Sequence, residues 1–143
     1  MEELNVFLDT NKFIFLYTVI RLILGILLFF QAYDKIFKIK LNHVISEITH
    51  GDKSSHVHPT ITKLSVYTSS YIELIGGIGL ILGIFTTPLL YLIGLHLMVV
   101  CFAFSFLDPV WDTKLVFSRL ILLAYLILNP IHFNIVSLDY LIF

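Results

Sequence analysis

The sequence predicts an all-α integral membrane protein, an up-down bundle of four spanning helices with an interfacial amphipathic helix in the first loop. Of its 143 residues, 58% are hydrophobic and 13% are charged, whereas soluble domains carry about 25% charged residues. A soluble fold of this length has too little interior to bury so much apolar surface. Four apolar stretches approach the roughly 20 residues that a helix needs to cross a bilayer. They lie at about residues 13–37, 67–85, 88–107 and 113–129.

The connections between these stretches predict the topology. One connection, residues 38–66, is long, and the later ones at 86–87 and 108–112 are short turns. Pro88 suits the first turn of a helix, where no backbone N–H is required, and Trp111 suits the membrane interface. Because short turns make successive helices antiparallel, we expect one four-span domain over residues 1–143, with both termini on the same side.

The start of the long connection predicts an amphipathic helix lying on the membrane surface. Its apolar residues recur at helical spacing on one face, and polar residues occupy the other face. Gly51 is placed to end the helix at its C-terminus. Such a helix either covers the end of the bundle or forms a docking surface for a partner. Its apolar face would carry Phe37, Leu41, Val44, Ile45 and Ile48.

The distribution of lysine predicts the orientation. Lys12 alone lies on the side of the termini. By the positive-inside rule, the long connection then lies in the cytoplasm and both termini lie outside. Glu2, Glu3 and Asp9 stand where a cleavable signal would be basic, so we expect the first helix to remain in a multi-pass protein of the inner (plasma) membrane. The lysines on the side of the long connection are Lys35, Lys38, Lys40, Lys53, Lys63 and Lys114.

Ionisable residues within spans are costly in lipid and therefore mark candidate sites. With a rise of about 1.5 Å per residue, Gln31, Glu73 and Arg119 all lie roughly 9 Å inside the cytoplasmic boundary, on three different helices. We expect a Glu73–Arg119 ion pair to which Gln31 is hydrogen-bonded, with Lys35 nearer the surface. This intramembrane polar cluster is either a structural clasp or part of a proton route.

A second polar layer is predicted nearer the outer side. Arg21 lies about 12 Å from the outer end of the first span, with His96 and Tyr125 at a similar depth on the third and fourth spans. A guanidinium stays charged and needs carbonyls, water, a lipid headgroup or an electron-rich ligand. The layer is a candidate site for a quinone or lipid headgroup, to which His96 could pass a proton. The other interpretation is a structural arginine satisfied by backbone and tyrosine hydroxyls.

Glycines in the second span predict close helix packing. Gly76, Gly79 and Gly83 recur at i, i+3 and i+7 on one helix face, and small residues let helices approach closely in lipid. The glycines lack the strand-to-helix context and the lysine of a phosphate-binding loop. We therefore interpret them as packing residues.

Composition excludes several function classes. Nine Lys and Arg against ten Asp and Glu give a net charge of −1, which leaves no basic face for nucleic acid. A lone cysteine, Cys101, excludes an internal disulfide or a CxxC pair. The loop histidines lack an accompanying cysteine or acidic pattern, so a solvated loop explains them better than a metal site. We expect no catalytic residue, metal or covalently bound cofactor. The loop histidines are His43, His50, His56 and His58.

Two segments resemble the DoxX-like family of four-helix membrane proteins. The segment from Arg21 through Gly25 to Lys35 resembles that family's first helix, which carries an Arg, a Gly one turn on and a Lys near its end. The glycine-rich segment from Glu73 to Thr86 resembles the Glu-led second helix of the family, which ends at a Thr.

Arg119 fits an arginine in the family's fourth helix, and the resemblance covers about residues 21–130. The family is named for a subunit associated with a terminal quinol oxidase and with thiosulfate:quinone oxidoreduction. The resemblance therefore implies a redox-associated or accessory membrane subunit. Because the sequence shows no nucleophile, metal cage or cofactor motif, we expect an accessory, non-catalytic subunit of a redox complex that binds and stabilises a partner. Its partners would be membrane lipids and other membrane or membrane-associated proteins. The alternative is a quinone-reactive oxidoreductase subunit with a headgroup site between the first, third and fourth spans.

Overall fold

A computed structural model describes residues 2–50, 58–107, 114–129 and 134–142. Within these ranges the chain is helical, without strands, which confirms the predicted all-α class. The elements in chain order are the α-helix α1 (Glu2–Tyr33), the π-helix η1 (Asp34–Ile39), and the α-helices α2 (Leu41–His50), α3 (Pro59–Leu82), α4 (Thr86–Leu107), α5 (Lys114–Leu128) and α6 (Leu138–Ile142).

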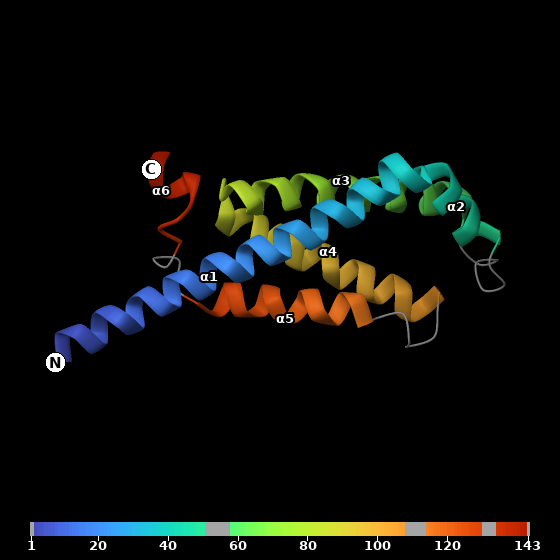
Figure 1. Ribbon diagram of the computed structural model, residues 1–143. Helices are drawn as coiled ribbons and strands as arrows, with labels where there is room; N and C mark the ends of the chain where they lie inside the picture. The colour runs from blue at the N-terminus through green and yellow to red at the C-terminus, as the bar shows by residue number, and fades with distance from the viewer. Residues whose placement is uncertain (1, 51–57, 108–113, 130–133, 143) are drawn as a thin grey trace.

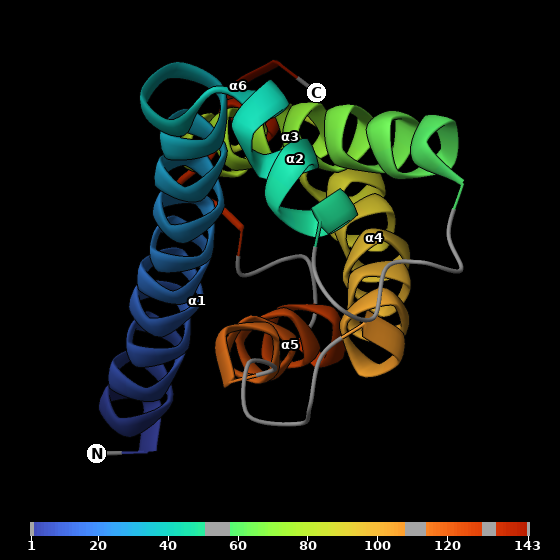
Figure 2. The same ribbon diagram turned by 90° about the vertical axis from the view of Figure 1, so that its right-hand side faces the viewer.

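Four helices form an up-down bundle. In Figure 1, α1, α3, α4 and α5 run alternately in opposite directions, and both termini lie at the same end. Helix α1 packs against α3, α3 against α4, and α4 against α5, while α5 returns to contact α1. Figure 2 shows these helices arranged around the axis of the bundle.

Most of these helices are long and apolar enough to cross a membrane. Residues Asn11–Ile39, Pro59–Leu82 and Thr86–Ala103 form helices long and apolar enough to cross a bilayer. Val116–Leu128 is a shorter apolar helix. The whole of α5 has 15 residues, so its length of about 22 Å falls short of a hydrocarbon core about 30 Å thick. The chain is therefore a membrane protein with several apolar helices.

The helix ends differ from the predicted spans for local reasons. Helix α3 begins at Pro59 rather than at residue 67, because proline fits the first turn and the side chain of His58 accepts a hydrogen bond from the Thr60 N–H. It ends at Leu82, because Gly83 takes a left-handed conformation with φ of 69°. Helix α4 then begins at Thr86, ahead of the proline predicted as its start.

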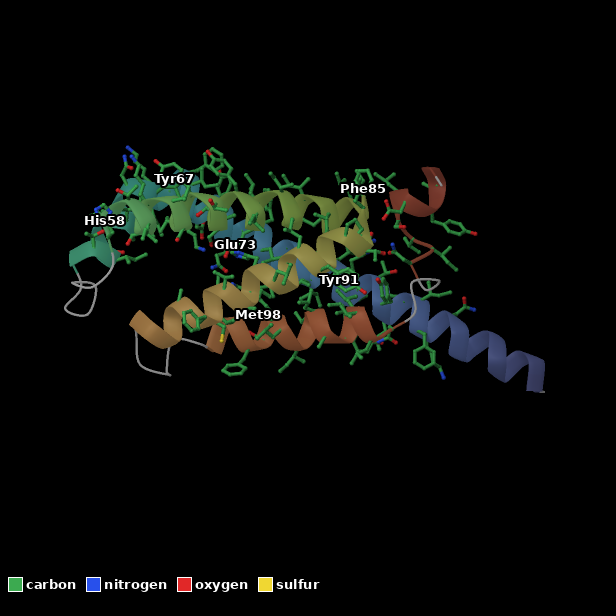
Figure 3. All side chains as sticks on the ribbon, turned by 180° about the vertical axis from the view of Figure 1, so that it is seen from behind. His58, Tyr67, Glu73, Phe85, Tyr91 and Met98 are labelled. Carbon is green, nitrogen blue, oxygen red and sulfur yellow. The ribbon has the colours of Figure 1, made fainter. Side chains whose placement is uncertain are left out.

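The bundle has apolar side chains outside and charged ones inside. Phe15, Phe102 and Ile121 are largely exposed, as are Tyr91 and Met98 along α4 (Figure 3). These outward side chains contact lipid. The interior combines apolar packing with charge, which in a membrane requires pairing or hydrogen bonding. Among the described residues, the buried side chains of the Arg, Glu and His types are Arg21, Glu73, His96 and Arg119.

The predicted amphipathic helix is present as α2. It packs against η1 and α3 at the end of the bundle away from the termini (Figure 1). Leu41 is buried, and the Tyr67 hydroxyl on α3 donates to the Asn42 side-chain oxygen at 3.3 Å. Gly51, the predicted stop, and the turn 108–112 with Trp111 lie outside the described residues.

A short C-terminal helix, α6, was not expected from the sequence. The carboxylate of Asp139 accepts hydrogen bonds from the backbone N–H groups of Phe85 (2.7 Å) and Thr86 (2.8 Å) at the start of α4. Its own N–H donates to the carbonyl of Gly83 at 2.9 Å. These contacts cap α4, because the first turn of a helix has N–H groups without intrahelical acceptors.

The hydrogen bonds of this cap also change the pKa of the Asp139 carboxyl. Partial burial raises the pKa of this carboxyl, but hydrogen bonds from Thr86 and Phe85 and the charge of Arg21 outweigh it and lower the pKa below its ordinary value of 3.8. The cap therefore stabilises the folded protein fully above that value, and its contribution is lost as the pH falls through the lower pKa of the folded state.

We expect Asp139→Asn to reduce the free energy of unfolding at pH 7 by about 1–2 kcal/mol, because the charged cap of α4 is lost. The variant should also lose less stability than the wild type when the pH falls below 4. Chemical denaturation in detergent at both pH values measures this. The control Tyr140→Phe alters an exposed neighbour and should behave as wild type. Equal acid sensitivity of Asp139→Asn and wild type would contradict the assignment.

Candidate functional site

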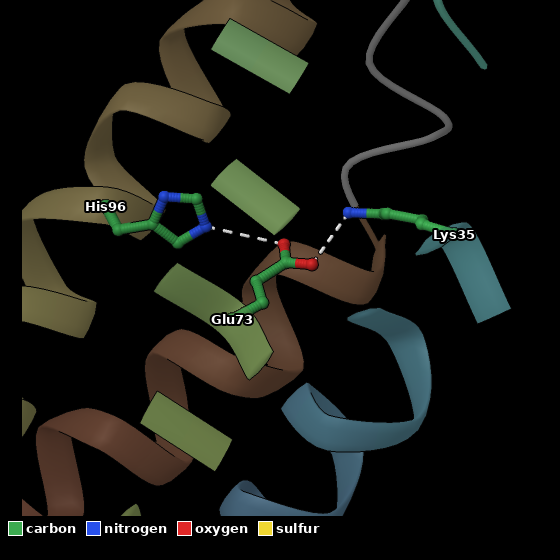
Figure 4. Close-up of polar contacts among 3 residues, drawn as sticks. All are labelled: Lys35, Glu73 and His96. Carbon is green, nitrogen blue, oxygen red and sulfur yellow. Dashed lines mark hydrogen bonds and ion pairs between the residues drawn. The ribbon is translucent and has the colours of Figure 1, made fainter. Parts of the chain in front are cut away.

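Side chains from three elements meet at a buried carboxylate. One oxygen of Glu73 on α3 accepts from the ammonium of Lys35 on η1 at 2.7 Å. The other lies 3.4 Å from Nε2 of His96 on α4. Figure 4 shows the carboxylate between the two partners. Glu73 is 1% exposed, and the Lys35 side chain is 24% exposed, so the contact fastens three elements together away from bulk water.

Local structure brings these partners into reach. Lys35 lies in the π-helical turn η1, a wide helical form that often occurs at functional sites. Its flexible stem can run along apolar surface while the ammonium reaches a polar group. On α3, Gly76 and Gly77 follow Glu73 within a turn, and their small size lets the neighbouring helices approach the carboxylate.

Arg119 supplies a second cation from α5. It is 5% exposed, and its charge and that of Glu73 attract each other through space. Among the described residues, the predicted Glu73–Arg119 contact pair does not form; the carboxylate oxygens contact Lys35 and His96. The depth count placed Glu73 and Arg119 in one layer. It could not show that Lys35 reaches inward from the surface.

Two further polar groups adjoin this centre in sequence. Gln31 lies one turn before Lys35, and Ser70 lies one turn before Glu73. Oε1 of Gln31 and Oγ of Ser70 are buried and have no hydrogen-bond partner among the described residues. Gln31 was predicted to bond to the ion pair, and no such bond occurs among the described residues. We call Lys35, Glu73, His96 and Arg119, with Gln31 and Ser70, the buried centre.

Arg21 lies in a separate layer nearer the termini. Its guanidinium donates to the carbonyls of Leu80 on α3 and Val136 before α6, the latter at 2.7 Å. Tyr17, one turn earlier on α1, interacts electrostatically with it. Arg21 is thus satisfied in part by backbone, as one interpretation of the sequence held. In the part of the chain that the structure describes, its Nε is buried without a hydrogen-bond partner.

The predicted grouping of Arg21, His96 and Tyr125 does not form as one layer. His96 belongs to the buried centre through Glu73. Tyr125 is half-buried on α5, and in the described part of the chain its hydroxyl makes no hydrogen bond to Arg21 or His96. The i, i+4 spacing of Tyr17 and Arg21 was the sequence signal for the tyrosine that does lie near this arginine.

The glycines of α3 serve different neighbours. A Cβ on Gly76 would meet Ile93 of α4 at 3.1 Å, and one on Gly79 would meet Leu89 of α4 at 2.2 Å. Gly83 ends α3 with a positive φ and lies against Ser137 and Arg21. A Cβ on Gly77 would lie only 2.7 Å from the backbone nitrogen of Phe29 on α1. Gly77 was not among the glycines predicted to serve in packing.

The remaining candidates do not assemble a site within the described ranges. No group of three metal-ligating side chains occurs there. His43 lies 3.6 Å from Glu47 one turn on, His58 caps α3, and His56 lies outside the described residues. Cys101 is a free, half-buried thiol.

The fold and the buried centre define a class of protein: a helical bundle with several membrane-spanning helices, lipid-facing apolar side chains and charges gathered inside. The DoxX family model matches residues 16–106, more than half of the chain, so the chain belongs to the DoxX family. No curated protein and no solved structure matches it. The family match ends within α4, so Arg119 and Asp139 lie beyond it.

Proposed function

We propose that this chain is an accessory, non-catalytic subunit of a redox-associated complex in the inner membrane, where it binds and stabilises a partner protein. The observation that carries the proposal is the use of the buried charges. Glu73 joins η1, α3 and α4, and Arg21 joins α1, α3 and the segment before α6. These charges hold the bundle together, which suits a scaffold for a partner.

Two surfaces are suited to docking. Helix α2 lies at one end of the bundle with its polar face exposed, and the lipid-facing sides of the long helices present apolar side chains that a second membrane protein can cover. The DoxX family's association with quinol oxidation supports a redox protein as the partner.

Purification from the native membrane in mild detergent tests the proposal. A stoichiometric partner should accompany the tagged chain, and deletion of the gene for the chain should lower the abundance of that partner. Restoring the wild-type chain must restore the partner. A chain that purifies alone and reduces quinone at enzymatic rates would contradict the accessory role.

A quinone-reactive oxidoreductase subunit is the second candidate. The contact between Glu73 and His96 favours it, because a carboxylate beside an imidazole can hold and transfer the proton that quinone reduction requires. The headgroup would lie between α1, α4 and α5, on the side of His96 that faces the bundle interior.

Titration with ubiquinone-1 tests this second candidate. His96→Gln should weaken binding, whereas Tyr91→Phe, an exposed change on the same helix as His96, should not. Equal affinity in wild type and His96→Gln would remove the site.

A further inference from the structure

We propose that the C-terminal segment, residues 134–142, lies in the membrane interface at the end of the bundle that bears the termini. Its inner side is polar and binds the bundle, and its outer side is apolar and contacts the upper part of the lipid acyl chains. The inference goes beyond the accessory role, since binding a partner does not require this segment to enter lipid. The predicted spans end at residue 129, so the sequence leaves the segment outside the bilayer.

The segment turns polar side chains inward and apolar side chains outward. Asn134 is 5% exposed and Ser137 is 8% exposed, whereas Val136, Tyr140 and Leu141 are 58%, 64% and 78% exposed. In water, a short segment gains stability by packing its apolar side chains against the core. The opposite arrangement is typical of protein in lipid, where polar groups face the bundle interior.

The backbone of the segment makes the kind of contact that lipid requires. Acyl chains offer no hydrogen bonds, so backbone groups at membrane depth must find partners within the protein. The Val136 carbonyl accepts from Arg21 at 2.7 Å, and the Asp139 N–H donates to the Gly83 carbonyl at 2.9 Å. The Ser137 hydroxyl bonds to backbone within the segment, namely to the Asn134 carbonyl at 2.7 Å and to the Tyr140 N–H at 3.3 Å.

Arg21 gives the depth of the segment in the membrane. Its hydrogen bond to Val136 places the segment level with this part of α1. Phe15 is 71% exposed and faces lipid, and it lies about 9 Å farther along the α1 axis toward the N-terminus. The part of α1 that can cross a bilayer begins farther still, at Asn11. Lipid that reaches Phe15 therefore also reaches the segment.

The outer side of the segment continues the lipid-facing surface of the bundle. Phe85, at the turn from α3 to α4, is 61% exposed, and its N–H donates to the Asp139 carboxylate at 2.7 Å. Figure 3 shows Phe85 at the end of the bundle that carries α6. Tyr140 is of the residue type that concentrates where lipid meets water. Asp139 is half-buried, and its charged carboxylate suits the headgroup region rather than the hydrocarbon centre.

Quenching of tryptophan by brominated lipid tests the proposal on the full chain in vesicles. Trp111→Phe removes the native tryptophan, and Leu141→Trp then places one fluorophore on the outer side of the segment. In phosphatidylcholine brominated in the upper part of the acyl chains, this tryptophan should lose most of its emission, because bromine quenches on close contact. In unbrominated lipid its emission should lie at shorter wavelength than in water.

Two matched variants calibrate the result in the same background. Ile121→Trp, at an outward position of α5 that is 69% exposed, should be quenched by the bromines. Glu47→Trp replaces a side chain that is 68% exposed on the polar face of α2, and it should be quenched by aqueous iodide instead. If Leu141→Trp does not fold, Tyr140→Trp places the fluorophore at the neighbouring outward position.

The outcome separates lipid from the other possible surroundings of the segment. A tryptophan at position 141 that bromine quenches no more than at position 47 would overturn the proposal. Iodide quenching would then show that the segment lies in water, and shielding from both quenchers would show that a second copy of the chain covers it. Each of these results leaves the partner experiment above unaffected.

Discussion

Glu73→Gln is expected to reduce the free energy of unfolding by about 3–5 kcal/mol, because removal of one member of a buried pair leaves the other charge uncompensated. Here the change leaves both Lys35 and Arg119 without the carboxylate that attracts them. It also weakens the contact with His96 that joins α3 to α4. Reversible unfolding in bicelles or mixed micelles measures the loss.

A matched control and a mutant cycle identify the partner. Glu47→Gln removes the same charge from an exposed position on α2 and should change stability by less than about 0.5 kcal/mol. In double-mutant cycles, Glu73 should couple more strongly to Lys35, which it contacts, than to Arg119. A cycle with Lys35→Met that shows no coupling would contradict the observed pairing.

Gly77→Ala should be the most damaging of the alanine substitutions at the glycines of α3 that face a neighbouring helix. A Cβ at this position would lie 2.7 Å from the backbone nitrogen of Phe29 and 2.9 Å from the carbonyl oxygen of Gly25, both on α1. Backbone atoms in a helix cannot move aside as a side chain can, so α1 and α3 must separate. Overpacking of this kind costs about 1–3 kcal/mol, and we expect the upper end of that range.

Gly94→Ala is the control for this prediction. A Cβ there would meet the end of the Leu123 side chain at 3.3 Å, which a small rotation relieves. The unfolding temperature of Gly94→Ala should stay close to that of wild type, whereas that of Gly77→Ala should fall by several degrees. Equal effects at the two positions would show that the backbones of α1 and α3 are farther apart at Gly77 than in the structure.

The sequence predicted the fold well because a helix that crosses a bilayer must be long and apolar, and hydropathy measures this property. The predicted spans correspond to α1 with η1, α3, α4 and α5, and the amphipathic helix corresponds to α2. The boundaries were less accurate, since they depend on local groups such as the cap at His58 and the left-handed Gly83. A hydropathy window does not register these groups.

The sequence predicted the depth of Glu73 and Arg119 in the membrane, but not which side chains contact each other. The rise per residue placed Glu73 and Arg119 in one layer, and their charges do interact. Contacts also depend on how each helix is rotated and on how far a side chain reaches. For this reason Lys35 was assigned to the surface and His96 to the layer of Arg21. The cap by Asp139 joins residues far apart in the sequence, so no local pattern indicated it.

The cap has a consequence for the order of biosynthesis. The N–H groups of Phe85 and Thr86 receive their acceptor from Asp139, and Arg21 receives one of its carbonyls from Val136. Translation runs from the N-terminus, so both sites wait until residues 136–139 have left the ribosome. The helices can insert in sequence, but the end of the bundle where α3 meets α4 closes only after the segment leading into α6 has been synthesised.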